Sequence, residues 1–571
     1  MARAPREPKG HLKRWERGGA ERVPVILERW TRSRFLATAA VLLALAGAAT
    51  WLWRPAAVLL ALVAVVVAIG LADILQTRRT ILRNFPIIGH LRYLAESVRP
   101  ELRQYFVESD TDGTPFSREK RSVVYQRAKD VVDTQAFGTR HSVYDVGYEW
   151  ISHSFTPTRP EPTTARILIG NERCARPYRA SIFNISAMSY GSLSSRAVLA
   201  LNEGARLGGF FHNTGEGGIS PYHLRPGGDL VWQIGTGYFG CRTEDGRFDP
   251  GLFRERAALD SVKMIELKLS QGAKPAHGGI LPADKVTPEI ARIRGVPLGR
   301  DVVSPPAHTA FAGPLGLLEF IAELRELSGG KPVGFKLCVG HPADVLAIVK
   351  AMRASELSPD FITVDGAEGG TGAAPLEFTN SVGMPLDEGL TLVHNALRGA
   401  GIRDRVALIS AGKITTGLHV LHQLALGADL CNSARAMMFA IGCIQALKCN
   451  TNECPTGVAT QKPHLVKGLV VEDKAARVAR YHAKTVESML ELVGASGLAS
   501  PADLRPHHIY RRISSAEVRH LGEVYPPIPE GSLLEGAAPE PYQSQWDAAS
   551  AEVFGPIVEE KRGNSEERRS A

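Results

Sequence analysis

The chain has 571 residues, including 56 glycines and seven cysteines, and its formal net charge is +8. It is long enough for one large domain with additional segments, and seven cysteines in this length do not form a secreted disulfide framework. The positive charge does not predict nucleic-acid binding, because the basic residues gather at the N-terminus and not on an aromatic-rich platform.

Two apolar runs near the N-terminus predict a transmembrane helical hairpin over residues 35–75. The runs, Phe35–Trp53 and Ala56–Leu75, each approach the ~20 residues that cross a bilayer. Residues 1–34 form a basic leader with about ten Lys and Arg. Because Arg78, Arg79 and Arg83 follow the second run, both flanks are basic and are expected on the cytoplasmic side.

The predicted location is therefore a membrane, crossed twice, with the catalytic domain in the cytoplasm. A signal peptide is the alternative for the first run, but the long leader and the second span disfavour it. Residues 76–164 carry no recognisable motif and are interpreted as a connecting or cap segment, and residues 501–571 as a polar C-terminal tail.

Residues 165–500 alternate short apolar runs with segments of helical length, which predicts an α/β fold, a (β/α)8 TIM barrel. The longest gap separates the fourth and fifth strands, so insertions are expected there. The eight predicted strands are Ser181–Ala187, Gly209–Asn213, Leu230–Ile234, Met264–Lys268, Val333–Leu337, Phe361–Val364, Val406–Ser410 and Ala428–Cys431.

Glycines and small polar residues follow several of these strands, where a barrel carries its functional groups. Each cluster alone is compatible with an ordinary turn, but together they favour a ligand site in which backbone amides approach a flat ring or an anion. The candidate residues in these clusters are Ala187, Met188, Ser189, Asn213, Gly370, Gly412, Ser433 and Ala434.

Lys336 interrupts an apolar strand, and a lysine facing a barrel interior needs a ligand or an acid as partner. An inward Lys336 could stabilise an anionic flavin, and the alternative is a surface lysine. Gln233 could bind the polar edge of a flavin or serve as a structural amide.

The polar stretch from Glu266 to Arg294 offers two cations, Lys274 and Arg294, which could bind a dicarboxylate. A solvated charged loop is the alternative from the residues alone. Glu216 could cap a turn, or it could handle ammonia or a proton.

Three cysteines, Cys443, Cys449 and Cys454, lie in one polar, turn-forming stretch followed by Pro455. Closely spaced thiolates before a proline are typical of iron–sulfur ligation. Buried free thiols are one alternative, and a zinc site is another, although no His or fourth Cys stands at ligand spacing.

The cysteine pattern followed by Pro-x-Gly-Val-Ala-Thr-Gln resembles the cluster-binding segment of the synthase domain of glutamate synthases. Four more motifs recur in the family order: Asn213–Gly218, Gln271–Pro275, Ser304–Pro306 and Gly369–Gly372. The resemblance covers about residues 165–500.

The resemblance implies FMN over the C-terminal face of the barrel, with Lys336 contacting it, and a [3Fe-4S] cluster on the three cysteines. It implies that Gln271, Lys274 and Arg294 hold 2-oxoglutarate. Lys274, Glu216 and Gln271 are the expected catalytic residues. Ala187, Met188, Ser189, Asn213, Gln233, Gly370, Gly412, Ser433 and Ala434 are the other expected FMN contacts. The implied reaction reduces 2-iminoglutarate, formed from 2-oxoglutarate and ammonia, to L-glutamate.

The chain also departs from the large synthase subunits. It begins Met1-Ala2-Arg3 with no glutaminase domain, so ammonia is expected from solution or a partner. It shows no nicotinamide-binding motif, so ferredoxin or another separate electron donor is expected. The alternatives are an electron-transfer module without amination activity and an FMN barrel acting on another oxo or hydroxy acid.

Overall fold

The computed structural model describes residues 30–555, which fall into two compact units that meet in sequence at Gly113 and Thr114. The predicted basic leader up to residue 29 and the last part of the predicted tail, residues 556–571, lie outside the described residues.

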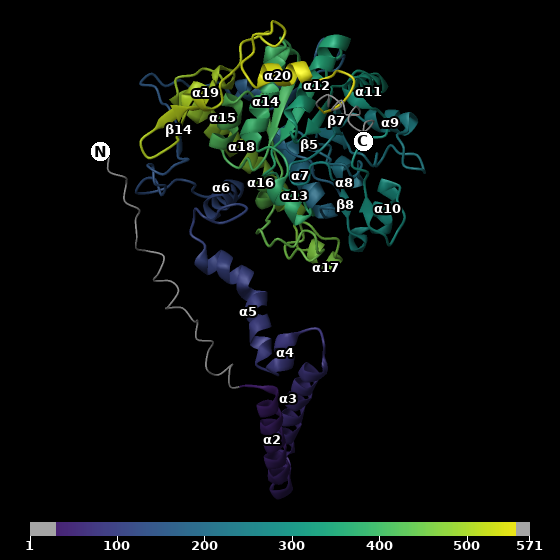
Figure 1. Cartoon of the computed structure of the whole chain (residues 1–571), viewed down its shortest axis with the longest axis vertical. Coiled ribbons are helices and arrows are strands. Elements are labelled where there is room, and N and C mark those ends of the chain that lie inside the picture. The colour runs from purple at the N-terminus through teal and green to yellow at the C-terminus, as the bar shows by residue number, and fades with distance from the viewer. Residues whose placement is uncertain (1–29, 556–571) are drawn as a thin grey trace, which may run out of the picture. The chain divides into compact units, whose positions relative to one another are not determined.

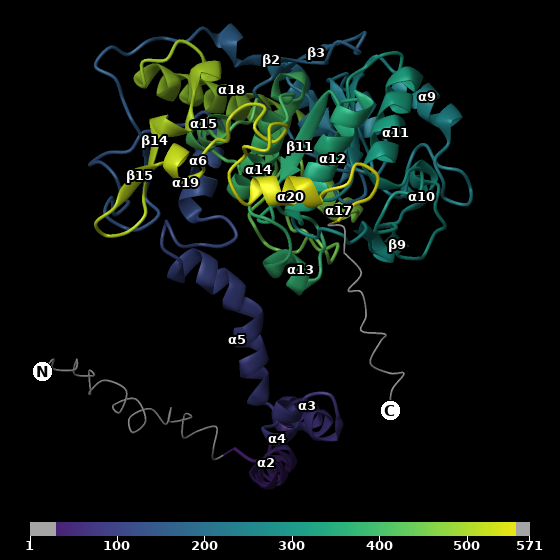
Figure 2. The ribbon, with the colours of Figure 1, turned by 45° about the horizontal axis from the view of Figure 1, so that its top comes forward.

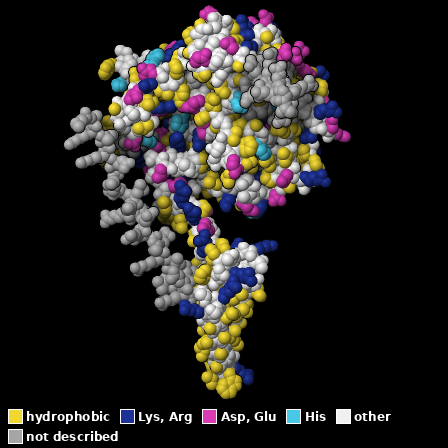
Figure 3. Space-filling view, viewed as in Figure 1, with side chains coloured by type: hydrophobic (Ala, Val, Ile, Leu, Met, Phe, Trp, Pro, Cys, Tyr) yellow, Lys and Arg dark blue, Asp and Glu magenta, His cyan; other side chains and the backbone are white. Residues whose placement is uncertain are grey.

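The first unit contains the predicted hairpin, made of α2(Arg32–Leu52) and α3(Ala57–Leu75) joined by the 3-10 turn η1(Arg54–Ala56). The helices approach closely where Phe35 packs on Gly70, because a Cβ at residue 70 would lie 2.1 Å from the Phe35 ring. Both helices are long and apolar enough to cross a membrane. Their outer surface is apolar, and Trp51 is 86% exposed (Figure 3).

Shorter helices complete the first unit. They are α4(Thr80–Asn84), α5(Gly89–Leu102) and the π-helical turn η2(Arg103–Val107). The buried Asp73 of α3 fixes the start of α5, because its carboxylate accepts hydrogen bonds from the Ile87 amide and from His90 Nε2, both at 2.9 Å.

The second unit is built on a closed barrel of eight parallel strands (Figure 1). Every predicted strand is present and the predicted TIM-barrel fold is confirmed. Strands such as Val333–Leu337 are buried along their whole length, as expected when helices cover a parallel sheet. In barrel order the strands are β4(Phe183–Ile185), β5(His212–Asn213), β6(Leu230–Ile234), β7(Val262–Lys268), β10(Val333–Leu337), β11(Phe361–Asp365), β12(Ala407–Ala411) and β13(Leu430–Ser433).

Helices surround the barrel, and their apolar faces fill the layer between helix and sheet. The main ones are α7(Ser195–Gly208), α9(Pro250–Ala257), α11(Gly313–Leu327), α12(Pro342–Ser355), α14(Leu386–Gly399), α15(Gly417–Ala425), α16(Arg435–Ala440) and α18(Val471–Ala495). The longest, α18, packs on α7 and on α6(Arg118–Lys129) of the connecting segment.

The expected insertion between the fourth and fifth barrel strands is confirmed. It holds the antiparallel pair β8(Ile280–Leu281) and β9(Val302–Val303), with η4(Ala283–Lys285) and α10(Pro288–Arg294) between them. Further short helices are α8(Pro221–Leu224), α13(Leu376–Ser381) and α17(Pro463–Val466), and β2(Arg166–Ile169) pairs with β3(Tyr178–Ser181) ahead of the barrel.

A small sheet joins the two segments that flank the barrel in sequence. Its order is β1(Glu149–Ile151), β14(Ile509–Arg512) and β15(Val518–His520), all antiparallel. With α19(Leu521–Val524), the sheet lies at one side of the barrel unit (Figure 2). Another helix of this C-terminal segment, α20(Tyr542–Ala548), packs on α12.

A charge network holds this sheet to the barrel helices. His422 of α15 contacts Glu149 and Asp387, each at 3.1 Å, and Arg511 contacts the same two carboxylates. Burial opposes protonation of His422, but hydrogen bonds and charges from Asp387 and Glu149 outweigh it and raise the pKa of His422 to about 9.

The protonated His422 therefore stabilises the folded state in a defined pH window. Its contribution is fully present below the unfolded pKa of 6.5 and is lost as pH rises through about 9. We expect a difference on the order of 3 kcal/mol in the free energy of unfolding between His422→Gln and the parent at pH 6, shrinking towards pH 9.5. Chemical denaturation of the detergent-solubilised chain at several pH values measures it. A difference that does not change with pH would show that His422 is held neutral.

Candidate active site

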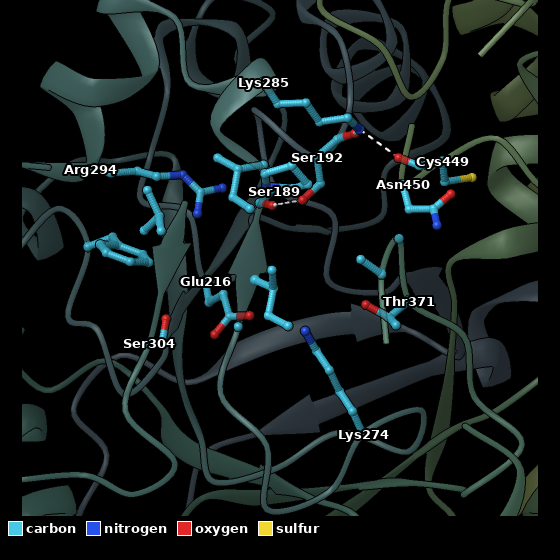
Figure 4. Close-up of a pocket in the computed structure, with 18 residues that line it drawn as sticks. Ser189, Ser192, Glu216, Lys274, Lys285, Arg294, Ser304, Thr371, Cys449 and Asn450 are labelled. Atoms are coloured by element: carbon cyan, nitrogen blue, oxygen red, sulfur yellow. Dashed lines mark hydrogen bonds between the residues drawn. The ribbon is translucent and has the colours of Figure 1, made fainter. Parts of the chain in front are cut away.

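Two adjoining cavities lie at the C-terminal ends of the barrel strands. They share a wall made by Ser189 after β4, Glu216 after β5, Thr371 after β11, and Cys449 of the cysteine loop, residues 443–454 (Figure 4). The first cavity extends towards Lys274 and Arg294 of the insertion, and the second towards Gln233 and Gln271. Side chains from strands far apart in the sequence thus meet at the face where barrel enzymes carry their active sites.

Three cations act on Glu216: Lys274 and Arg294, which line the first cavity with it, and Lys268. Lys268, the last residue of β7, places Nζ 2.7 Å from Glu216 Oε1, and both Lys274 and Arg294 act on the same carboxylate. Although burial favours the neutral acid, the Lys268 ammonium and the other two charges hold the pKa of Glu216 below its usual value. Three cations facing one carboxylate leave an excess of positive charge, which favours an anionic ligand.

Burial disfavours the protonated forms of two of these cations. It lowers the pKa of Lys274 to about 8, against the opposing effect of Glu216, and that of Arg294 to about 10. The Arg294 guanidinium lies against the Phe239 ring, 5.2 Å from its centroid, and donates to the Tyr190 carbonyl at 3.2 Å. Its Nε is buried and finds no hydrogen-bond partner within residues 30–555. The site therefore holds an unused buried donor next to a lysine that titrates near neutral pH.

A second polar cluster lies inside the barrel. Glu266 of β7 accepts hydrogen bonds from Asn213 at 2.8 Å, Gln233 at 2.5 Å and Thr363 at 2.7 Å. The buried Lys336 pairs with Asp365 at 3.3 Å. Burial opposes its charge, but Asp365 and Glu266 outweigh this effect and raise the pKa of Lys336. This arrangement keeps a fixed ammonium in the barrel mouth.

The loop that carries Gln271 and Lys274 is held against the loop after β11. The Gly272 amide donates to Asp365 Oδ2 at 3.0 Å, and Gln271 Nε2 donates to Thr371 Oγ1 at 3.4 Å. A Cβ at Gly272 would lie 1.7 Å from the Gly366 carbonyl oxygen, so only glycine allows this approach.

Gly272→Ala is therefore expected to lower the free energy of unfolding by about 1–3 kcal/mol, because the two loops must move apart. Gly372→Ala is the matched control: its Cβ would meet no atom within 4 Å, so the expected change is within about 0.5 kcal/mol. Denaturant titration of the two variants in detergent compares them directly. Equal effects would contradict the close contact at residue 272.

The cysteine loop lies beside these cavities. Hydrogen bonds from the Thr456 hydroxyl and from backbone amides outweigh burial and lower the pKa of Cys454. Burial, together with the charges of Cys449 and Cys454, raises the pKa of Cys443 to about 11, so the three thiols are electrostatic neighbours. Arg435 Nη1 lies 3.8 Å from Cys449 Sγ.

The described residues contain no group of three or more His, Cys, Asp or Glu side chains placed to hold a single metal ion. A cluster makes a different demand, since each cysteine binds a separate iron and the sulfurs need not converge on one point. Neighbouring thiols with one lowered pKa and a nearby guanidinium fit the chemistry of such ligands.

The sequence of residues 159–499 matches the protein-family model described as the conserved region in glutamate synthase. This chain belongs to the glutamate synthase family. It is 38% identical to the glutamate synthase large subunit-like protein YerD of Bacillus subtilis, covering 79% of this chain and 94% of that protein. It is also 37% identical to the archaeal glutamate synthase [NADPH] of Methanocaldococcus jannaschii, covering 56% of this chain and 60% of the relative.

Solved structures with a similar fold are more distant. A flavocytochrome b2 variant with pyruvate bound is 12% identical, with a TM-score of 0.37, and the match covers 74% of this chain and 85% of that chain. A mandelate oxidase variant with (S)-mandelic acid is 16% identical, with a TM-score of 0.39, and the match covers 75% of this chain and 98% of that chain.

Within this glutamate synthase family chain, most of the residues singled out from sequence line the two cavities. The first cavity has Ser189, Glu216, Lys274, Arg294 and Cys449 in its wall, and the second has Ala187, Met188, Ser189, Glu216, Gln233, Gln271, Gly370, Ala434 and Cys449. The lining of neither cavity includes Asn213, Lys336, Gly412, Ser433, Cys443 or Cys454. Of these, Asn213 and Lys336 belong to the polar cluster inside the barrel, and Ser433 Oγ donates to the Ile414 carbonyl at 2.7 Å.

Two lysines of the site were missed from the sequence. Lys268 is the last residue of a buried barrel strand, and Lys336 lies within another. A lysine in such a strand is the sequence signal that singled out Lys336, and it could also have found Lys268. Lys285 lies in the insertion, and its Nζ donates to the carbonyls of Cys449 at 2.8 Å and Ala459 at 3.0 Å (Figure 4 shows the bond to Cys449). No sequence signal marks Lys285, which joins the insertion to the cysteine loop.

Proposed function

We propose that this chain is an FMN- and iron–sulfur-dependent oxidoreductase that reduces 2-iminoglutarate, formed from 2-oxoglutarate and ammonia, to L-glutamate, with electrons from a separate donor. Family membership supports the reaction class. The observation that carries the proposal is the group of Lys268, Lys274 and Arg294 around Glu216. Glu216, Lys274 and Arg294 line one cavity together with Cys449. An electron carrier alone has no use for such a dicarboxylate-binding cluster.

The charged residues suit both parts of the substrate. The guanidinium of Arg294, with its unused Nε, can bind one carboxylate, while Lys274 and the amide of Gln271 bind the other end. Glu216 stays ionised beside Lys268 and can take a proton as ammonia adds to the 2-oxo carbon. Loss of water then leaves the imine between these groups.

The flavin contacts are proposed from the residues around the second cavity and the polar cluster inside the barrel. FMN, when bound, supplies hydride transfer. Lys336 provides a buried ammonium, Asn213 and Gln233 provide amides, and Ala187, Met188, Ser189 and Gly370 provide backbone edges. Gly412 follows β12, and Ser433 and Ala434 end and follow β13, where barrels frequently bind phosphate. This donor set fits an anionic ring with a phosphate tail, and Cys443, Cys449 and Cys454 are the proposed ligands of a [3Fe-4S] cluster.

An anaerobic single-turnover experiment tests the proposal. The detergent-solubilised chain is reduced with dithionite, 2-oxoglutarate and ammonium are added, and flavin reoxidation and glutamate are followed. Reoxidation that requires both additions and yields glutamate is expected. A flavin that stays reduced would reject amination and favour an electron-transfer module, while reoxidation by 2-oxoglutarate alone would indicate reduction of an oxo acid. Reduced ferredoxin in place of dithionite tests the proposed donor.

We also propose that α2 and α3 anchor the protein in a membrane, with the basic leader and barrel in the cytoplasm. Support comes from two helical spans, Arg32–Leu52 of 21 residues and Arg54–Leu75 of 22 residues, the second of which includes η1. Their apolar windows are only 17% and 11% buried, whereas core helices of soluble proteins are mostly buried. Retention of the chain in membranes washed with alkaline carbonate is expected, and release into the wash would reject the anchor. Residues 76–164 then connect anchor and barrel, residues 165–500 form the catalytic domain, and residues 501–571 form the C-terminal segment.

A further inference from the structure

A large cavity lies at the opposite end of the barrel from the candidate active site. Its floor is made by residues that precede barrel strands, including Ile182 before β4 and Asp429 before β13, with the C-terminal half of α14. Its other walls come from the segment after α18, residues 501–507 and 520–527, which belongs with the small sheet in Figure 2. Its volume of about 770 Å³ falls within the roughly 300–1,000 Å³ of small-molecule sites.

Three arginines line this cavity. Arg403 already has partners, since it pairs with Asp429 at 2.9 Å and donates to His394 and to two backbone carbonyls. Arg398 donates only its Nε, to the Ile528 carbonyl, and Arg505 donates to the carbonyls of Ala502 and Leu504. In the part of the chain that the structure describes, neither Arg398 nor Arg505 forms an ion pair.

The charges converge on one point of the wall. Burial, with the charges of Arg403, Arg398 and Arg505, lowers the pKa of His394 to about 4, so this ring is neutral near pH 7. Among the described residues that line the cavity, the acids are Asp429, which pairs with Arg403, and the exposed Asp404. Two guanidinium groups without carboxylate partners are suited to bidentate recognition of a phosphate.

Aromatic rings face the same space. His507 and His520 line the cavity with Tyr525, and the two imidazole centroids lie 6.5 Å apart at 83°. A ring of this kind can stack on any nucleobase, because every base has a π face. The two arginines without ion pairs, the rings and the volume of the cavity together fit a ligand that has both a phosphate and a flat ring.

We propose that this cavity binds a nucleoside phosphate, with Arg398 and Arg505 on the phosphates and the rings of His507 and His520 beside the base. The site lies away from the candidate active site and does not depend on the proposed reaction. A ligand here would bridge the barrel base and the C-terminal segment, and it would therefore stabilise their packing.

Calorimetric titration of the full, flavin-loaded chain in detergent tests this site, with ADP and inorganic pyrophosphate as probes and no substrate or reductant present. Saturable binding of one ADP per chain is expected, with competition by pyrophosphate. The double variant Arg398→Met/Arg505→Met should bind ADP at least roughly tenfold more weakly, since each lost charged hydrogen bond contributes about 1.5–3 kcal/mol. Arg519→Met, on β15 and paired with Glu517, is the matched control and should bind as the parent does.

The outcomes separate cleanly. No saturable ADP binding at millimolar concentration, or equal binding by parent and double variant, would overturn the site. Binding of pyrophosphate without ADP would overturn the nucleoside part and leave a simple phosphate site. If the double variant does not fold, the single variant Arg505→Met replaces it, because this side chain is exposed, and the same loss of affinity is expected.

Discussion

A Cys449→Ser variant is expected to lose its iron and its cluster absorbance while the barrel remains folded. The serine hydroxyl has nearly the size of the thiol but is a poor iron ligand. Cys449 is half-buried, and its sulfur lies beside the Arg435 guanidinium while its carbonyl accepts from Lys285, so cations surround the position where a thiolate would bind iron. Iron and sulfide analysis, with low-temperature EPR of the oxidised protein, measures the loss.

Cys174→Ser provides the matched control for this experiment. Cys174 is also partly buried, but it lies outside the cysteine loop and its Sγ donates to the Gly330 carbonyl at 3.3 Å. This variant should keep the iron content of the parent. Iron retained by Cys449→Ser, or lost equally by both variants, would reject the assignment of the loop as a cluster site.

The barrel could be predicted from sequence because its strands obey a simple rule. A parallel strand covered by helices on one side and packed with side chains on the other is mostly apolar. Leu230–Ile234 and Phe361–Val364 show this as short apolar runs, in which Gln233 and Thr363 belong to the polar cluster inside the barrel. The strand ends then indicated where most of the site lies. Ser189, Glu216 and Gly370 lie in the loops just after strands β4, β5 and β11, and a barrel brings such positions together.

The sheet of β1, β14 and β15 could not be predicted in this way. Its pairing joins Trp150 to Tyr510, and in the sequence the whole barrel lies between these two residues. Its last two strands are partly exposed and rich in Arg and His. Local hydrophobic patterns carry no information on such distant pairing. The network of His422 and the arginine-lined cavity could not be predicted either, because both form only when the C-terminal segment packs on the barrel.

The lysines of the active site show a different limit. The side chain of Lys268 reaches Glu216 from another strand end, so their ion pair depends on barrel register, which one sequence does not reveal. Lys285 reaches the cysteine loop from an insertion that has no counterpart in the repeating strand–helix pattern.

Lys274→Met is expected to weaken 2-oxoglutarate binding roughly 10- to 100-fold, because a charge-assisted hydrogen bond in a buried site contributes about 1.5–3 kcal/mol. The pKa of Lys274, lowered by burial to about 8, adds a pH signature. The side chain carries its charge below pH 8 and loses it above, so the affinity of the parent for the 2-oxoglutarate dianion should fall as pH rises through 8. Binding to the oxidised protein, followed by flavin absorbance without ammonium, avoids the titration of ammonia itself.

Lys274→Arg distinguishes charge from packing in the same experiment. Arginine keeps its charge throughout this range, so the fall in affinity above pH 8 should disappear even if absolute binding is weaker than in the parent. Lys274→Met should bind weakly and without the pH dependence. An affinity of the parent that stays constant from pH 7 to 9 would mean that Lys274 does not meet the substrate, and Arg294 with Lys268 would then remain as the cations that hold the dicarboxylate.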